Sequence, residues 1–289
     1  MSASFRNAAP GGGKLWDRSC WTRWGALLLP FLLTACQSVR TTESGVVGIE
    51  RTQMMSPLVS EAQLRQGAAQ AYQQVLGQER EKRTLNADPQ MSERVRRIAG
   101  RLIAVSGAFR PDAPSWAWEV NVIRSDQINA WCMPGGKIAV YTGLITRLGL
   151  NDDELAAVIG HEIAHALREH SRERASERMV TQTGLGVAAA IAGLPAISTD
   201  MARLALEVTV SLPNSRLHES EADRMGVELA ARAGFDPRAA ITLWQKMARL
   251  SEGKGPEFLA THPSAETRSR DLEVWSERVM PLYNRRPAR

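Results

Sequence analysis

The sequence contains few cysteines, which limits both disulfide chemistry and thiol catalysis. Only three of its 289 residues are cysteine. Cys20 and Cys36 lie in or directly after an N-terminal leader, so Cys132 has no partner for an intrachain disulfide. A small secreted fold held together by disulfides is therefore excluded. A catalytic thiol needs a histidine close by, whereas Cys132 lies in an apolar, strand-like run, so we expect a core residue there.

The sequence also lacks an apolar run that could cross a bilayer and a large charge of one sign. A membrane-spanning helix needs roughly 20 apolar residues, and the two apolar runs here cover only residues 24–33 and 184–197. The second run is either a helix or helical hairpin packed over the core, or an apolar lid or membrane contact. Residues 1–35 account for three of the five net positive charges, so the rest carries +2. We therefore expect no nucleic-acid partner.

The first 35 residues have the order of a secretory signal peptide. A basic stretch ending at Arg23 precedes the apolar run, which is followed by the small residues Thr34 and Ala35. The stretch 33–36, Leu-Thr-Ala-Cys, resembles a bacterial lipobox, in which the cysteine is lipidated and becomes the first mature residue. An ordinary signal peptide followed by an unrelated cysteine is the alternative.

A lipid on Cys36 would anchor the chain firmly, because two or three acyl chains hold far better than one. Gln37 follows the cysteine, and in the usual bacterial sorting pattern the absence of aspartate there indicates the outer membrane. We therefore expect a lipid-anchored protein of the bacterial cell envelope that faces the periplasm. Residues 36–60 show no sustained periodicity and are predicted to be a tether.

Residues 61–289 predict one α+β domain, mainly helical and with a small antiparallel sheet. Apolar residues recur at helical spacing, and cap residues and prolines mark helix starts. The predicted helices cover 60–83, 88–105, 142–148, a long stretch beginning at 151–153, 212–233, 237–250 and 264–279. Strands at 116–122, 128–133 and 137–141, with Pro134-Gly135-Gly136 as a turn, predict an antiparallel meander.

The long helix carries the chemistry, because His161-Glu162-Ile163-Ala164-His165 is an HExxH motif. Residues four apart on an α-helix point within about 40° of each other, so His161 and His165 can bind one zinc ion. Glu162 lies about 60° from His165 and can reach a water on that ion without occupying a coordination position. Zinc lowers the pKa of this water, and Glu162 would accept its proton and pass it to the leaving amine.

A catalytic zinc takes three protein ligands, and the third is sought in the run 218–223, His-Glu-Ser-Glu-Ala-Asp. Glu219 and Asp223 are four residues apart and share a helix face, so Glu219 would complete a His₂Glu site. Asp223 could accept a hydrogen bond from a ligand imidazole and fix its tautomer. Glu221 points elsewhere and is predicted to be solvated.

These motifs together resemble the HtpX and Oma-type gluzincin metallopeptidase family, whose HExxH and ExxxD motifs lie on two helices. The resemblance rests on HEIAHALREHS and, some fifty residues later, SRLHESEADRMG, and covers roughly residues 60–280. Further matches are Asn129-Ala130, Pro134-Gly135-Gly136 with Tyr141-Thr142-Gly143, and Thr261-His262-Pro263. In outline the chain is most similar to periplasmic and outer-membrane members.

The resemblance implies a zincin-like domain with one zinc ion on His161, His165 and Glu219, Glu162 as the catalyst and Asp223 in support. It also implies endopeptidase activity on unfolded, misfolded or misassembled envelope proteins. Unlike the integral-membrane members, this chain has no spanning helices, so substrates buried in the membrane are not expected.

The remaining histidines are predicted to differ in role. His170 is half a turn out of phase with His161 and cannot join the same zinc, and His218 points about 100° from Glu219, so both are expected to be structural. His262 precedes a helix and could fold over the metal, to stabilise the oxyanion or to bind zinc as a fourth ligand and keep the enzyme latent. Arg216 is a candidate for steadying the oxyanion or Glu219.

Substrate binding is predicted along the strand 128–133, beside the metal helix. Zinc peptidases commonly bind an extended peptide at an exposed sheet edge through main-chain hydrogen bonds. We therefore expect Asn129 and Ala130 to contact substrate, with Gly135 and Gly136 allowing close approach. Two alternatives remain: a zinc-binding chaperone or assembly factor with gated or vestigial peptidase activity, and a structural lipoprotein with a stabilising zinc, which would not need Glu162.

Overall fold

The computed structural model describes residues 36–191, 200–250, 257–263 and 267–285. The predicted signal peptide, residues 1–35, and the end of the second apolar run, residues 192–197, lie outside the described residues. The chain divides into two compact units, Met1–Ala35 and Cys36–Arg289, and all of the structure that follows belongs to the second.

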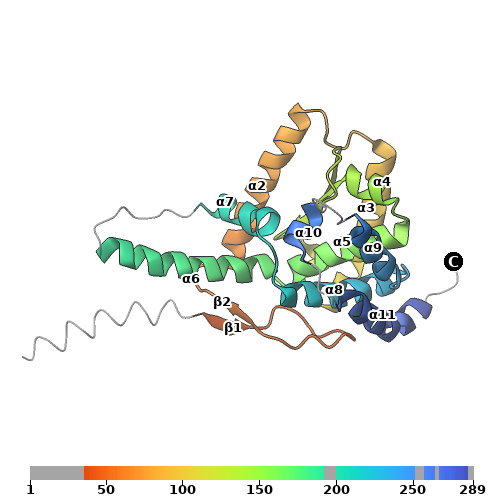
Figure 1. The fold of residues 1–289 in the computed structure, drawn as a ribbon. Coiled ribbons are helices and arrows are strands. Elements are labelled where there is room, and N and C mark those ends of the chain that lie inside the picture. The colour runs from red at the N-terminus through yellow and green to blue at the C-terminus, as the bar shows by residue number, and fades with distance from the viewer. Residues whose placement is uncertain (1–35, 192–199, 251–256, 264–266, 286–289) are drawn as a thin grey trace, which may run out of the picture. The chain divides into compact units, whose positions relative to one another are not determined.

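The fold is mainly helical, as predicted for an α+β domain (Figure 1). The α-helices are α2 (Glu61–Glu81), α3 (Pro89–Ala104), α4 (Thr142–Leu148), α5 (Asp152–Leu167), α6 (His170–Ile191), α7 (Met201–Leu206), α8 (Arg216–Ala233), α9 (Ala239–Arg249), α10 (Glu257–Thr261) and α11 (Arg268–Asn284). Short 3₁₀ turns cover Ser106–Ala108 and Ala113–Ser115, and a π-helical turn, η3, covers Glu207–Ser211. The predicted starts hold, because Ser60, Asp88 and Asn151 cap α2, α3 and α5 through their side chains.

Helix α5 lies at the centre and packs against α8, α3, α9 and strand β4. Its contact with α8 is close because two glycines face each other. A Cβ atom on Gly160 would lie 3.1 Å from the carbonyl oxygen of Gly226, and one on Gly226 would lie 3.0 Å from the backbone nitrogen of His161. Larger side chains here would push the helices apart, so the pair brings the HExxH helix within reach of α8.

The three-stranded sheet has the order β3 (Glu119–Ile123), β5 (Lys137–Tyr141), β4 (Ala130–Met133). The antiparallel hairpin of β4 and β5 is confirmed, and β4 is an edge strand as expected. The pairing of β3 with β5 is parallel, so the predicted meander was wrong at this strand. The connection between β3 and β4 passes over the end of β5, where a Cβ atom on Gly143 would lie 2.4 Å from the carbonyl oxygen of Asp126.

The segment 36–60, expected to be a tether, is instead part of the folded unit. Strands β1 (Gln37–Val39) and β2 (Gln53–Met55) form an antiparallel hairpin. Val47 and Ile49 are buried in the main core, and the Val47 amide donates to Glu228. The tether prediction was wrong because this segment is held by long-range contacts, which leave no periodic pattern in the sequence.

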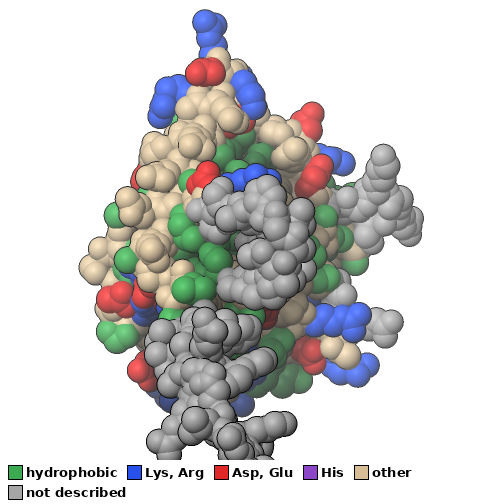
Figure 2. Space-filling model, turned by 90° about the vertical axis from the view of Figure 1, so that its left-hand side faces the viewer, with side chains coloured by type: hydrophobic (Ala, Val, Ile, Leu, Met, Phe, Trp, Pro, Cys, Tyr) green, Lys and Arg blue, Asp and Glu red, His purple; other side chains and the backbone are tan. Residues whose placement is uncertain are grey.

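None of the helices in the described ranges is long and apolar enough to cross a membrane. Residues 184–191 of the second apolar run continue helix α6, which extends away from α5 and α8 in Figure 1. Figure 2 shows charged side chains of both signs interspersed with hydrophobic ones on the visible face of the molecule.

Candidate metal centre

Two helices place the predicted zinc ligands together. The Nε2 atoms of His161 and His165, near the end of α5, are 3.0 Å apart. Glu219, in the first turn of α8, places Oε2 3.3 Å from His161 Nε2 and Oε1 3.3 Å from His165 Nε2. All three side chains are buried.

The spacing of these atoms fits a coordinated metal better than a set of hydrogen bonds. Zinc–nitrogen bonds of about 2.0–2.1 Å in a tetrahedral site put neighbouring ligand atoms about 3.3 Å apart. The Nδ1 atom of His161 lies 3.0 Å from Asp223 Oδ1, so the imidazole in its neutral form donates there and turns its Nε2 lone pair toward Glu219. A lone pair and a carboxylate oxygen repel each other, and a cation between them removes that repulsion. Two imidazoles and one carboxylate are the donor set of a catalytic zinc.

The charges around His161 support the same conclusion. Burial alone lowers the pKa of this imidazole, but Glu219 and Asp223 outweigh burial and raise the pKa of His161 to about 9 in the metal-free chain. The site therefore stabilises a positive charge, carried by a proton or by a metal ion. Metal binding must release that proton, because a zinc ligand is a neutral imidazole.

Glu162 lies beside the ligands, with 3% of its surface exposed. Burial raises the pKa of its carboxyl group, partly opposed by His262 and His161 and by the backbone amide of Cys132 in β4. Its Oε1 atom accepts no hydrogen bond from the described residues. A carboxylate with a free oxygen and a raised pKa suits a general base.

The sequence did not reveal Arg268, which joins the two carboxylates of α8. Its guanidinium donates to Glu219 Oε2 at 3.2 Å and to Asp223 Oδ1 at 2.6 Å. It also lies over the ring of Trp244, 3.2 Å from the centroid. Arg268 begins α11, far along the chain from both carboxylates, and no motif marks it.

Arg216, the predicted partner of Glu219, takes no such part. It is exposed at the start of α8, and within the described residues no hydrogen bond or ion pair joins it to Glu219. Both residues line the same surface pocket, but the guanidinium that contacts Glu219 belongs to Arg268. The side chain of Arg216 is exposed to solvent, so it does not accompany Glu219 into the buried site; its other predicted role, steadying the oxyanion, stays a prediction.

His262 does reach the site, directly after α10. Its ring stacks on Phe258, with ring centroids 4.2 Å apart, and its Nδ1 atom is 3.0 Å from Glu219 Oε1. Its Nε2 atom is 3.4 Å from Glu162 Oε1. With His161, His165 and Glu219 it forms the group of described residues that could hold a metal ion.

His170 and His218 are buried and stacked on each other outside the ligand group, as expected for structural residues. The prediction for Glu221 was wrong. Only 3% of Glu221 is exposed, and its carboxylate pairs with Arg51 and Arg168. No sequence pattern predicts this pairing, because Arg51 belongs to the segment 36–60, for which a tether is predicted. Cys132 is a free, buried thiol, as predicted.

The predicted substrate residues surround the edge strand β4. Asn129 and Ala130 are buried at its start. Gly135 and Gly136 form the turn after it, both with φ near +80°, and a Cβ atom on Gly136 would lie 2.5 Å from the indole of Trp118. Glycine is therefore required for this turn.

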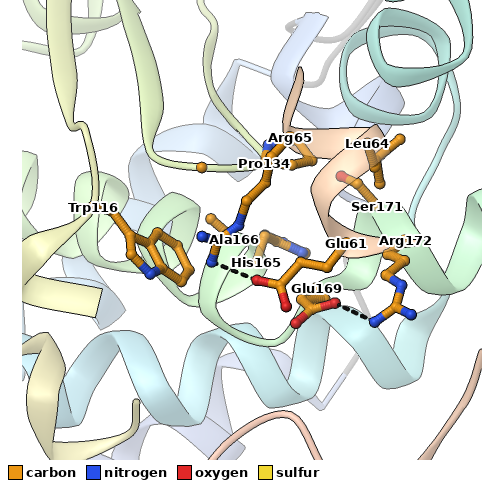
Figure 3. Close-up of a pocket in the computed structure, with 11 residues that line it drawn as sticks. Glu61, Leu64, Arg65, Trp116, Pro134, His165, Ala166, Glu169, Ser171 and Arg172 are labelled. Atoms are coloured by element: carbon orange, nitrogen blue, oxygen red, sulfur yellow. Dashed lines mark hydrogen bonds and ion pairs between the residues drawn. The ribbon is translucent and has the colours of Figure 1, made fainter. Parts of the chain in front are cut away.

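A pocket connects the turn after β4 to a metal ligand (Figure 3). Gly135 and His165 both line it, Trp116 and Leu64 form apolar walls, and the ion pairs of Glu61 with Arg65 and Glu169 with Arg172 border it. An apolar cleft with charged groups at its border is typical of a binding site for a side chain.

The comparison with known families assigns the domain. The model of Peptidase family M48 matches residues 89–276, more than half of the chain and all of the residues in the proposed ligand set. The chain belongs to this family. M48 metallopeptidases use zinc, so the domain is a zinc metallopeptidase domain, and the group described above contains residues that could hold the ion.

Similar proteins come from mitochondria and from bacteria. The mitochondrial metalloendopeptidase OMA1 of Schizosaccharomyces pombe is 39% identical over 183 residues, 63% of this chain and 52% of that protein. The β-barrel assembly-enhancing protease of Yersinia pestis is 31% identical over 206 residues, 67% of this chain and 40% of that protein. The Escherichia coli K12 protein of the same name is 29% identical over 208 residues, covering 68% and 41%. The match therefore spans about half or less of each relative.

Proposed function

We propose that the protein is a zinc-dependent endopeptidase of the bacterial cell envelope that degrades misfolded or misassembled envelope proteins. The observation that carries the proposal is the meeting of His161, His165 and Glu219 from two helices, with Glu162 beside them. Glu162 separates an enzyme from a structural zinc protein, because a structural site does not need a buried carboxylate next to its ligands.

The proposed reaction is hydrolysis of a peptide bond. Bound zinc would polarise the scissile carbonyl and acidify the attacking water. Glu162 accepts the proton of that water through its free Oε1 atom and transfers it to the leaving amine. Asp223 holds His161 in the tautomer that offers Nε2, and Arg268 donates to both Asp223 and Glu219 and so holds the two carboxylates in place.

The proposed substrate is an extended stretch of an unfolded protein. Strand β4 is an edge strand, and an edge strand can pair with a substrate strand through its backbone groups. The amide of Cys132 in β4 acts on the Glu162 carboxylate, which puts a bound backbone close to the base. The pocket in Figure 3 would receive a substrate side chain next to His165. Recognition through the backbone selects unfolded chains rather than one particular sequence.

The proposed location is the outer membrane, with the domain facing the periplasm and anchored by lipid on Cys36. The lipobox-like residues before Cys36 and the bacterial relatives named for β-barrel assembly support this location.

The alternative function, a chaperone or assembly factor with gated peptidase activity, is favoured by one observation. His262 touches both Glu219 and Glu162, so its ring lies directly beside the proposed base and the third ligand. In this reading His262 holds the site closed until a substrate displaces it.

The decisive experiment compares wild type with Glu162→Gln on an unfolded protein such as casein, with zinc content measured in parallel. We expect the variant to keep its zinc and to lose at least about 100-fold in cleavage rate, the range that follows loss of a general base. Glu177→Gln, the same change at an exposed position of α6, is the control and should cleave at the wild-type rate. Equal cleavage by wild type and Glu162→Gln would refute the catalytic role.

The same assay tests the gated alternative through His262→Ala. Gating predicts faster cleavage than wild type, whereas a contribution to catalysis predicts slower cleavage. An unchanged rate would leave His262 a loop residue without a role in turnover. A wild-type protein that prevents aggregation of casein but cleaves it no faster than Glu162→Gln would support the chaperone function.

A further inference from the structure

The two zinc-binding histidines are supported in different ways. His161 donates from Nδ1 directly to a carboxylate, Asp223. Among the described residues, no carboxylate contacts the Nδ1 atom of His165, which lies 2.8 Å from the Nδ1 atom of His170. The other ring nitrogen of His170, Nε2, lies 3.0 Å from Glu221 Oε2. Thus a second imidazole stands between this ligand and its carboxylate.

With both imidazoles neutral and the Glu221 carboxylate as an acceptor, only one arrangement of protons satisfies this series of contacts. An ionised carboxylate can only accept, so Glu221 receives the Nε2–H of His170. A neutral His170 then has a lone pair on Nδ1, which accepts the Nδ1–H of His165. His165 is left with a lone pair on Nε2, the atom that faces His161 and Glu219. The alternative tautomer of His170 would place a proton on the metal-facing nitrogen of His165.

Two arginines donate to the Glu221 carboxylate. Arg168, fully buried, donates to it at 3.1 Å, and Arg51 donates to it at 2.8 Å. Arg51 belongs to the N-terminal segment, just before strand β2. The acceptor that orients His170 is therefore fixed by side chains from α5's C-terminal end and from the segment that follows Cys36.

We propose that His170 and Glu221 are positioning residues that set the tautomer of His165 and thereby its affinity for zinc. Neither residue touches the metal, and both act through His165. The inference concerns metal binding alone, so it stands or falls separately from the proposed substrate and location.

A purely structural role for His170 makes a different prediction, and its neighbour His218 supplies the comparison. The rings of His170 and His218 stack with centroids 4.3 Å apart, and both are buried. His218 bonds to Glu173 at 3.0 Å and has no hydrogen bond to a zinc ligand among the described residues. The two histidines therefore share an environment and differ in their contact with His165.

The first test replaces each histidine with asparagine and with leucine, which have the same branched shape. Asparagine at 170 keeps an oxygen near the position of Nδ1 to accept from His165, and leucine does not. We expect His170→Leu to bind zinc about 10- to 100-fold more weakly than His170→Asn, measured by competition with a chromophoric chelator. The cobalt-substituted His170→Leu protein should also show an altered visible absorption spectrum.

At position 218 the same two substitutions should give equal zinc affinities, because no ligand depends on that ring. Equal affinities for His170→Asn and His170→Leu, both folded by circular dichroism, would overturn the proposal. So would a difference at 218 as large as that at 170, because it would reflect the polarity of the cluster rather than the tautomer of His165.

A second measurement needs no variant. In ¹⁵N spectra of the wild-type zinc protein labelled at histidine, His170 should carry its proton on Nε2 and His165 on Nδ1. Detection of His170 protonated on Nδ1 would refute the proposal even if the leucine variant fails to fold.

Discussion

Replacement of Arg268 by methionine is expected to destabilise the metal-free protein strongly. Methionine keeps an apolar side chain over Trp244 but removes the guanidinium that bridges Glu219 and Asp223 at 3.2 and 2.6 Å. Both carboxylates are buried, and loss of one partner of a buried ion pair costs about 3–5 kcal/mol. In a domain of this size each kcal/mol lowers the melting temperature by about 2–4 °C. The expected decrease is therefore about 6–20 °C.

The measurement is thermal unfolding with excess chelator, because bound zinc would partly neutralise Glu219 and conceal the effect. Arg238→Met is the matched control, because the Arg238 side chain is 56% exposed. Loss of its exposed ion pair with Asp236 should leave the melting temperature unchanged. A decrease of less than about 2 °C for Arg268→Met would mean that the guanidinium does not compensate the two carboxylates. Restored stability on adding zinc to the variant would confirm that charge compensation is the cause.

Two further predictions concern the N-terminal segment. Burial alone would raise the pKa of Glu173 and of Glu221. His218 and Arg51 outweigh burial at Glu173, so its pKa lies below the ordinary value. Arg51 and Arg168 do the same at Glu221. The two ionised carboxylates therefore contribute fully to the stability of the fold above a pH of about 4.5, and this contribution is lost as the pH falls through their pKa values in the folded protein. Urea unfolding between pH 5 and 3 should show this loss of stability, and Arg51→Met should make the loss smaller. Parallel stability curves for wild type and variant would contradict the prediction. For the anchor, mass spectrometry of protein from bacterial membranes should find an acylated N-terminal peptide starting at Cys36, and a peptide that continues through unmodified Cys36 would rule the anchor out.

The local features of this fold were predictable because they depend on neighbours in the sequence. Helix α4 (142–148) and strand β5 (137–141) lie where periodicity and turn residues placed them. Asn151 caps the HExxH helix, and the spacing of His161 and His165 made them neighbours on one face. Glu219 could be paired with them because the ExxxD spacing on a second helix is itself a local pattern.

The features that escaped prediction all depend on residues distant in sequence. The parallel pairing of β3 with β5 requires a connection over the end of β5. Period-two alternation predicts that a strand forms, but it does not predict with which strand or in which direction the strand pairs. Arg268 contacts Glu219 across 49 residues of chain and Arg51 contacts Glu221 across 170. The sequence alone does not distinguish a buried arginine from an exposed one, because burial of the arginine depends on a distant partner that neutralises its charge.

The folding of residues 37–60 onto the domain determines how far the catalytic domain could lie from a membrane. As an extended tether, 24 residues would span about 80 Å. Strand β1 instead begins at Gln37, immediately after Cys36, and Arg51 clamps the following chain onto the domain. An acyl group on Cys36 would therefore keep the peptidase against the lipid headgroups. Its substrates would then be polypeptides held at the bilayer surface. Polypeptides that diffuse through the periplasm would have to reach that surface before they could be cleaved.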